Sequence, residues 1–233
     1  MKQGKKVWGY FTVMEYGLWL GSVALIMISF LLFDKSNYLT LAASLIGVTS
    51  LIFNAKGHFV GQILMIIFSI LYGIISFTCA YYGEMITYLG MTGPMALVAL
   101  ISWLRHPFRG HRNEVAVNRL GGGEICLMAV LTTGVTVMFY FILKVCHTAN
   151  LLPSTLSVTT SFAAVYLTAR RSPYFALAYA ANDLVLILLW ILATLQSLSY
   201  LSVVVCFVVF FINDIYGFIS WRRMQKRQSD SIE

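Results

Sequence analysis

The stretch FFINDIYGFISWRRM, residues 210–224, places Asn213 and Asp214 inside an apolar run that ends near a pair of arginines. A carboxylate at the centre of a membrane-spanning helix costs about 2.5–3.5 kcal/mol on insertion scales. Such groups normally face the interior of a helix bundle or a water-filled cavity. The stretch therefore predicts a membrane helix whose polar face lines a site inside the protein.

The composition of the whole chain agrees with a membrane protein. Of its 233 residues, 59% are hydrophobic and 11% are charged, whereas a soluble domain carries roughly a quarter charged residues. A membrane span needs about 20 mostly apolar residues, and such runs fill most of the chain. We predict eight spans, at residues 16–33, 38–54, 60–81, 85–104, 124–146, 151–168, 174–194 and 199–221.

The net charge of +7 is explained by topology and not by nucleic-acid binding. If the N-terminus is cytoplasmic, only Lys35 and Lys144 fall on the outer side, and all other lysines and arginines, from Lys2, Lys5 and Lys6 onward, fall inside. That is the asymmetry of the positive-inside rule. We expect a multi-pass protein with both termini in the cytoplasm, membrane lipids as partners and no nucleic-acid partner. We also expect the first apolar run to be a retained helix and not a cleaved signal peptide.

The sequence contains an internal similarity on either side of the polar loop 105–123. The segment ISWLR (101–105) matches ISWRR (219–223), and IFNAKGHF (52–59) corresponds to YLTARRSP (166–173). We predict an all-α membrane protein with a 1+3+1+3 arrangement of helices and two parallel three-helix repeats, an organisation typical of transporters. The expected divisions are the N-terminus with the first helix (1–37), repeat 1 (38–104), loop and linker helix (105–150), repeat 2 (151–224) and a cytoplasmic tail (225–233).

Polar and aromatic residues follow helical stripes in several predicted spans. Asn182 and Asp183 lie in the middle of one span, at about the depth of Asn213 and Asp214 in the next. Aromatic rings beside amides and carboxylates suit a flat, polar, ring-containing solute. The residues we expect to bind this solute are Tyr179, Asn182, Asp183, Trp190, Asn213, Asp214, Tyr216, Gln62, Ser69 and Tyr72. The alternative is that the amides and hydroxyls only join helices by hydrogen bonds.

Other features receive simpler interpretations. Trp103 and Trp221 lie at span ends, where anchoring in the interfacial aromatic belt is expected. Glu84 lies at an outer helix end, where we expect it to be solvated. Pro94 removes a backbone hydrogen bond in mid-span and predicts a distortion there. Cys79, Cys126, Cys146 and Cys206 form no ligand or disulfide pattern, so we expect no metal and no cofactor, and no catalytic motif indicates an enzyme.

Several longer segments resemble the PnuC family of vitamin and nucleoside transporters. They are YYGEMITYLGMTGPMALVALISWLRHPFRGHRNEVAVNRL (81–120), YAANDLVLILLWILA (179–193) and FFINDIYGFISWRRM, and the similarity covers about residues 38–224. The resemblance implies a fold like that of the SWEET sugar carriers and facilitated import of nicotinamide riboside across a bacterial inner membrane. It also implies a functional link to a cytoplasmic kinase that phosphorylates the solute.

The match to the family pattern is incomplete in one half of the chain. Asp183 and the Tyr216…Trp221 segment follow the pattern, whereas Phe68 and Ala96 stand where the family often has Asn and Gln. Thiamine, riboflavin or deoxynucleoside uptake therefore stays open, as do a SWEET-like sugar carrier and a membrane scaffold or sensor. Proton coupling through Asp183 or Asp214, against uniport, and homo-oligomerisation are likewise left open.

Overall fold

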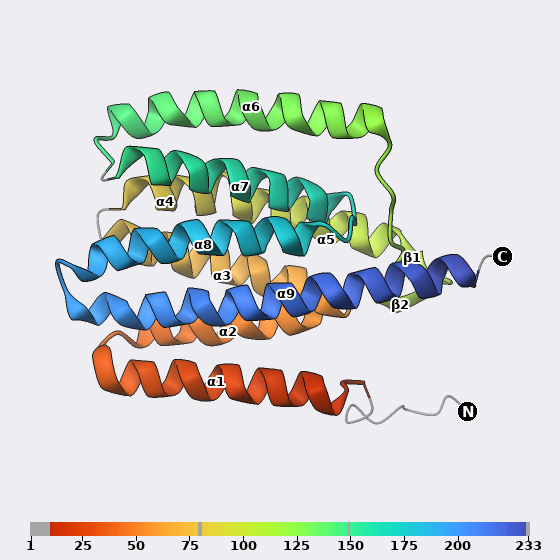
Figure 1. Ribbon diagram of the computed structural model, residues 1–233, viewed down its shortest axis with the longest axis horizontal. Helices are drawn as coiled ribbons and strands as arrows, with labels where there is room; N and C mark the ends of the chain where they lie inside the picture. Colours follow the sequence, from red (N-terminus) through yellow and green to blue (C-terminus); the bar gives the residue numbers. More distant parts are fainter. Residues whose placement is uncertain (1–9, 79–80, 149, 232–233) are drawn as a thin grey trace.

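The computed structural model describes residues 10–78, 81–148 and 150–231, and Figure 1 shows a bundle of helices lying side by side along its long axis. Eight helical stretches in this part of the chain are long and apolar enough to cross a membrane, as predicted. The helical segments are α1 (Val13–Phe33), α2 (Tyr38–Ala55), α3 (Val60–Thr78), α4 (Tyr82–Thr87), the π-helix η2 (Tyr88–Thr92), α5 (Gly93–Arg105), α6 (Gly122–Val145), α7 (Leu151–Ala169), α8 (Phe175–Thr194), the 3-10 helix η3 (Leu198–Tyr200) and α9 (Leu201–Asp230). The sequence interpretations of Lys2, Lys5, Lys6 and Cys79 lie outside the described residues.

The helices form a closed ring of two halves. We name α2 through α5 the N-half and α7 through α9 the C-half. Helices α2, α3 and α5 pack in succession within the N-half, α7, α8 and α9 do so within the C-half, and the pairs α5–α7 and α2–α9 join the two halves. Helices α1 and α6 lie outside the ring at opposite edges of the bundle (Figure 1). Within each half, the first helix packs on the second and the second on the third.

The first corners of the two halves have the same backbone geometry. Gly57 and Arg171 follow α2 and α7 in the left-handed conformation, with φ of 66° and 58°. The next residue donates its N–H back to the helix in both corners, from His58 to Phe53 O and from Ser172 to Leu167 O, each at 3.0 Å. Glycine tolerates the left-handed conformation at little cost, whereas Arg171 adopts it only because the surrounding structure holds it there.

The polar loop between the halves contains a short hairpin that the sequence interpretation missed. Strands β1 (Pro107–Phe108) and β2 (His111–Val115) form an antiparallel two-stranded sheet. The loop then bonds to both corners, because Val115 N donates to Gly57 O at 3.1 Å and Asn118 N donates to Arg171 O at 3.0 Å. It thus connects the N-half to the C-half at the end of the bundle where α1 begins and α9 ends, which we call the terminal end (Figure 1).

Two predicted boundaries differ from the structure. The span expected at 85–104 is not one regular helix, because η2 separates α4 from α5 and the N–H of Gly93 bonds to Tyr88 O, just before Pro94. The segment expected to be a tail from residue 225 continues α9 as far as Asp230. Gln228 explains this extension, because its side chain accepts from Val117 N at 2.8 Å and donates to Val115 O at 3.0 Å.

Trp103 and Trp221 are not the interfacial anchors that the sequence suggested. Their side chains are 2% and 0% exposed, and they pack with Phe175 in a core at the terminal end of the bundle. The indole of Trp103 donates to Thr168 O at 2.9 Å, and that of Trp221 donates to Asn54 O at 2.7 Å. The belt interpretation was wrong because a tryptophan at a span end has the same sequence signature whether it faces lipid or a neighbouring helix.

Candidate functional site

Asp183 of α8 and Asp214 of α9 meet in the interior of the C-half. They are only 4% and 5% exposed, and their carboxyl groups lie at hydrogen-bonding distance from each other. Oδ2 of Asp183 has no hydrogen-bond partner among the described residues. Two carboxyl groups in contact must share a proton or attract a cation, because two bare negative charges would repel each other. The pair is therefore incomplete in the protein alone.

Residues from both halves surround this pair. Tyr179 lies one helical turn before Asp183 and interacts electrostatically with both carboxyl groups. Tyr88, in η2 of the N-half, interacts electrostatically with Asp183 and Tyr179, and also with Glu84. We call these five residues, Glu84, Tyr88, Tyr179, Asp183 and Asp214, the central cluster. Its members come from both halves of the bundle.

The sequence interpretation missed both N-half members of this cluster. Glu84 was expected to be solvated, but it is 5% exposed and its Oε2 has no partner among the described residues. The expectation failed because an acidic residue near the predicted end of a span normally reaches water. The available signal was Pro94, since a helix distorted before a proline can turn residues of its first turns inward, and π-turns are frequent at functional sites.

A network of aromatic rings extends from the central cluster toward the end of the bundle away from the termini. Tyr88 and Tyr72 have ring centroids 4.3 Å apart, and the indole of Trp190 donates to Tyr72 Oη at 2.6 Å. Tyr81 and Tyr200 pack on Trp190 with centroids 5.2 and 5.6 Å from it. Tyr72 and Trp190 are 3% and 2% exposed, so both rings are buried inside the bundle.

Asn182 is adjacent to Asp183 in sequence but faces another helix. Its Oδ1 accepts hydrogen bonds from Ser157 at 3.3 Å, Thr160 at 2.9 Å and Ser161 at 3.0 Å, all on α7. Hydroxyls and amides of this kind hold membrane helices together. Asn182 therefore fixes α8 against α7 and so sets the position of Asp183.

Gln62 and Ser69 make contacts within the N-half. Gln62 Nε2 donates to Asn54 Oδ1 at 2.8 Å, and Asn54 Nδ2 in turn reaches Ser50 Oγ at 3.3 Å, which joins α3 to α2. Ser69 Oγ donates to Met65 O of its own helix at 2.8 Å. The structure does not bring either residue into the central cluster.

Asn213 and Tyr216 lie on the face of α9 that packs against α1. Asn213 Nδ2 donates to Ser22 Oγ at 2.9 Å, and Tyr216 Oη donates to Glu15 Oε1 at 2.9 Å. Glu15 also pairs with Lys56 at 3.1 Å. These two expected site residues therefore connect α9 to the outer helix α1, and Asn213 Oδ1 stays buried without a partner among the described residues.

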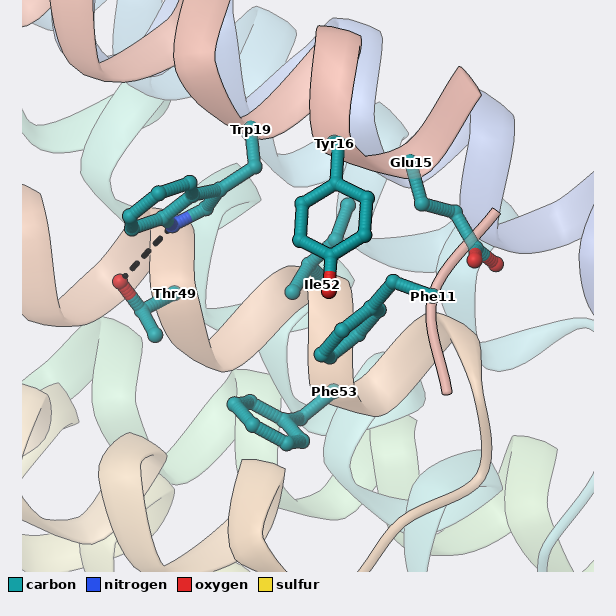
Figure 2. A pocket seen from close by; sticks show the side chains of 7 residues that line it. All are labelled: Phe11, Glu15, Tyr16, Trp19, Thr49, Ile52 and Phe53. Carbon is teal, nitrogen blue, oxygen red and sulfur yellow. Dashed lines mark hydrogen bonds between the residues drawn. The ribbon is translucent and has the colours of Figure 1, made fainter. Parts of the chain in front are cut away.

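A cavity of about 340 Å³ lies beside this contact, between α1 and α2 (Figure 2). Figure 2 shows aromatic side chains around it, with Glu15 at one edge and the indole of Trp19 bonded to Thr49 Oγ1 at 3.2 Å. Its remaining lining residues are Phe11, Tyr16, Ile52 and Phe53. The cavity lies on the outer side of the ring, so it is separate from the central cluster.

The central cluster can bind a small solute that offers hydrogen-bond donors or positive charge on a flat ring. Its carboxyl oxygens accept hydrogen bonds or balance a cation, and Tyr88 and Tyr179 present ring faces and hydroxyls. The described residues contain no group of three or more His, Cys, Asp or Glu side chains that could hold a metal ion.

Comparison with known proteins gives a consistent result. The model of a family described as nicotinamide mononucleotide transporter matches residues 37–223. A curated relative, the nicotinamide riboside transporter PnuC of Neisseria mucosa, is 26% identical over 230 residues, which cover 95% of this chain and 84% of the relative. A solved structure described as the crystal structure of the vitamin B3 transporter PnuC superposes with a TM-score of 0.81 at 23% identity and covers 94% of each chain, which shows a shared fold.

Proposed function

The chain belongs to the nicotinamide mononucleotide transporter family, and we propose that it carries nicotinamide riboside or a closely related nucleoside or vitamin through the central cluster. The observation that carries the proposal is the Asp183–Asp214 pair, which is buried among aromatic rings with one carboxyl oxygen unpartnered. Burying a carboxyl group without a partner costs roughly several kcal/mol, unless a ligand or water forms a hydrogen bond with it or a proton neutralises its charge. A structural bundle has no need of this arrangement, whereas a solute site does.

The side chains at two positions of the N-half bear on which of the related solutes is carried. Phe68 stacks on Tyr72 with a centroid separation of 5.5 Å, and Ala96 is 3% exposed, so the positions where the family often has amides are apolar here. Fewer amides leave fewer hydrogen bonds for a sugar or an amide-bearing ring. Thiamine, riboflavin and deoxynucleosides are therefore the alternative solutes, and a hexose is disfavoured because carboxyl groups dominate the cluster.

The mechanism we propose is alternating access, in which the halves rock around the central cluster as two parallel repeats. The paired corners and the exchange of hydrogen bonds by Trp103 and Trp221 support a twofold relation between the halves. The site is closed on the terminal side by these tryptophans and on the far side by Trp190, Tyr72 and their neighbours. A solute can reach the cluster only after one of these aromatic seals opens.

The direction of net transport follows from the fate of the solute. We propose uniport into the cytoplasm across a bacterial inner membrane, with both termini on the cytoplasmic side, in agreement with the distribution of lysine and arginine. A cytoplasmic kinase that phosphorylates the solute would keep its free concentration low and make downhill flow effectively one-way.

The test is uptake by purified protein in liposomes. A panel of radiolabelled nicotinamide riboside, thiamine, riboflavin, thymidine and glucose distinguishes the candidate solutes, and protein-free liposomes provide the background. We expect saturable uptake of nicotinamide riboside or of another member of the nucleoside and vitamin group. Binding of the whole panel below detection, together with uptake at background level, would contradict the transporter function.

A further inference from the structure

A groove of about 540 Å³ follows the last turns of α9 at the terminal end of the bundle. Trp221, Met224 and Gln228 of these turns are buried, so the groove lies on the remaining faces of the helix. It shares no lining residue with the cavity beside α1 or with the central cluster. Its lining comes from the loop before α6 and from α9, namely Arg119, Phe218, Ile219, Arg222, Arg223, Gln225, Lys226, Ser229 and Asp230.

The charge of this groove is positive and is not neutralised by the described protein. Four of the lining side chains are basic, and Asp230 is the one acidic side chain among them. The three ion pairs of the described residues all lie elsewhere. Arg119 and Arg222 donate to neutral oxygens, including Ser229 Oγ and Gln225 Oε1, both at 2.8 Å. The groove is therefore complementary to an anion.

The groove has an apolar end and a basic end. The apolar end is Phe218 with Ile219, which is 42% exposed, and the basic end consists of Arg119, Arg222, Arg223 and Lys226. At 1.5 Å per residue, Ile219 lies about 27 Å and Arg223 about 33 Å from the start of α9. The hydrocarbon core of a membrane is about 30 Å thick, so the boundary between acyl chains and headgroups falls between the two ends of the groove.

We propose that this groove binds an anionic phospholipid of the leaflet at the terminal end, with the headgroup phosphate at the basic end and an acyl chain against the apolar end. Guanidinium groups bind phosphate oxygens in a bidentate manner, and basic side chains beside a membrane attract anionic lipids. A free phosphate compound would occupy the basic end alone, whereas a lipid fills both ends. The inference does not depend on which solute the protein carries.

The experiment compares three ligands on the full-length protein in detergent. They are dioleoyl phosphatidylglycerol, which is anionic, dioleoyl phosphatidylcholine, which has the same chains and no net charge, and glycerol 3-phosphate, which is a soluble phosphate without acyl chains. Binding is quantified by native mass spectrometry over a range of ligand concentrations. We expect phosphatidylglycerol to bind at least about tenfold more tightly than either of the other two.

Arg223→Gln/Lys226→Gln tests the basic end directly. Both side chains are exposed and make no ion pair with the described residues, so the ligand-free variant should keep the thermal midpoint of wild type. Each basic residue near a membrane surface contributes about fivefold to the binding of an anionic lipid, so the variant should bind phosphatidylglycerol at least about tenfold more weakly. Asp230→Asn removes the opposing charge and should tighten the same binding.

Two controls separate the groove from net charge and from side-chain identity. Lys35→Gln/Lys144→Gln removes the same charge from exposed positions at the opposite end of the bundle (Figure 1), and it should leave phosphatidylglycerol binding within about twofold of wild type. The charge-conserving exchange Arg223→Lys/Lys226→Arg should bind within about threefold of wild type.

The possible outcomes decide between a lipid site and simpler electrostatics. Equal binding of phosphatidylglycerol and phosphatidylcholine would overturn the preference for an anion. Binding of glycerol 3-phosphate as tight as that of phosphatidylglycerol would replace the lipid with a soluble phosphate compound. Equal losses in Arg223→Gln/Lys226→Gln and in Lys35→Gln/Lys144→Gln would show diffuse attraction and no groove site. In each case the proposed transport function stands, because the groove contains no residue of the central cluster.

Discussion

Trp103 and Trp221 lie with ring centroids 5.4 Å apart, and each donates a hydrogen bond to the first helix of the opposite half. The neighbouring serines repeat the exchange, because Ser102 Oγ donates to Ala169 O and Ser220 Oγ donates to Ala55 O, both at 2.7 Å. The similar segments ISWLR and ISWRR thus close the same end of the bundle from opposite sides. Opening that end requires these bonds to separate.

A disulfide across this contact should therefore stop transport. In a background with the native cysteines replaced, we expect oxidised Ser102→Cys/Ala169→Cys to lose uptake by at least about tenfold, and a reductant to restore it. The measurement is solute uptake in liposomes before and after reduction. The control pair Thr136→Cys/Thr159→Cys joins α6 to α7, whose hydroxyls are 2.9 Å apart, outside the contact between halves. Full uptake by the oxidised Ser102/Ala169 pair would show that the halves do not move at this end.

Asn182 should act mainly through the position of α8. Asn182→Ala removes the acceptor shared by Ser157, Thr160 and Ser161. Interhelical hydrogen bonds in membranes contribute about 0.6–1.7 kcal/mol, so the thermal midpoint should fall by a few degrees, and maximal uptake should fall with it. Thermal unfolding in detergent tests the loss, with Thr133→Ala on the exposed face of α6 as control. An unchanged midpoint together with abolished solute binding would instead make Asn182 a direct ligand.

Gly61 should tolerate no side chain. A Cβ there would lie 2.1 Å from Asn54 Oδ1 and 2.8 Å from the Asn54 backbone nitrogen, so α2 and α3 would have to separate. Overpacking of this kind costs about 1–3 kcal/mol. Gly134 of α6 is the matched control, because a Cβ at that position meets nothing within 4 Å. Thermal unfolding should show a loss of stability for Gly61→Ala and little change for Gly134→Ala, and equal midpoints for the two variants would contradict the close α2–α3 packing.

Uniport predicts that a proton gradient does not drive transport. In liposomes whose membrane potential is held at zero, collapsing a pH gradient should leave the initial rate of solute uptake unchanged. The control is the same experiment with equal pH on both sides from the start. Uptake that requires the gradient would overturn uniport and would assign proton transfer to the Asp183–Asp214 pair.

Much of the fold followed from local sequence patterns. Apolar runs of span length predicted the membrane helices, because helix length and basic ends are properties of each segment alone. The repeated Ile-Ser-Trp segment predicted that residues 101–105 and 219–223 occupy corresponding positions in the two halves. The π-turn at Tyr88–Thr92 and the inward direction of Glu84 could not be predicted, since they depend on packing against α3 and α7.

The candidate site was predicted only in part, because the sequence shows which side chains are costly to bury but not which helix each one faces. The cost of burying a carboxylate identifies Asp183 and Asp214 from sequence alone, and the structure brings them together with Tyr179. The hydrogen-bond partners of Asn182, Asn213 and Gln62 depend on which face of each helix packs against its neighbours. Amides that join helices and amides that bind solute have the same spacing in a sequence, so only the packed bundle separates them.

The most direct test of the central claim is uptake by Asp183→Asn in liposomes. The account predicts that initial uptake of the transported solute falls at least about tenfold, because the amide cannot provide the negative charge of the pair. Insertion and gel-filtration behaviour should match wild type, and Asp34→Asn, at the C-cap of α1, should transport normally. Wild-type uptake by Asp183→Asn would contradict a solute site at the Asp183–Asp214 pair.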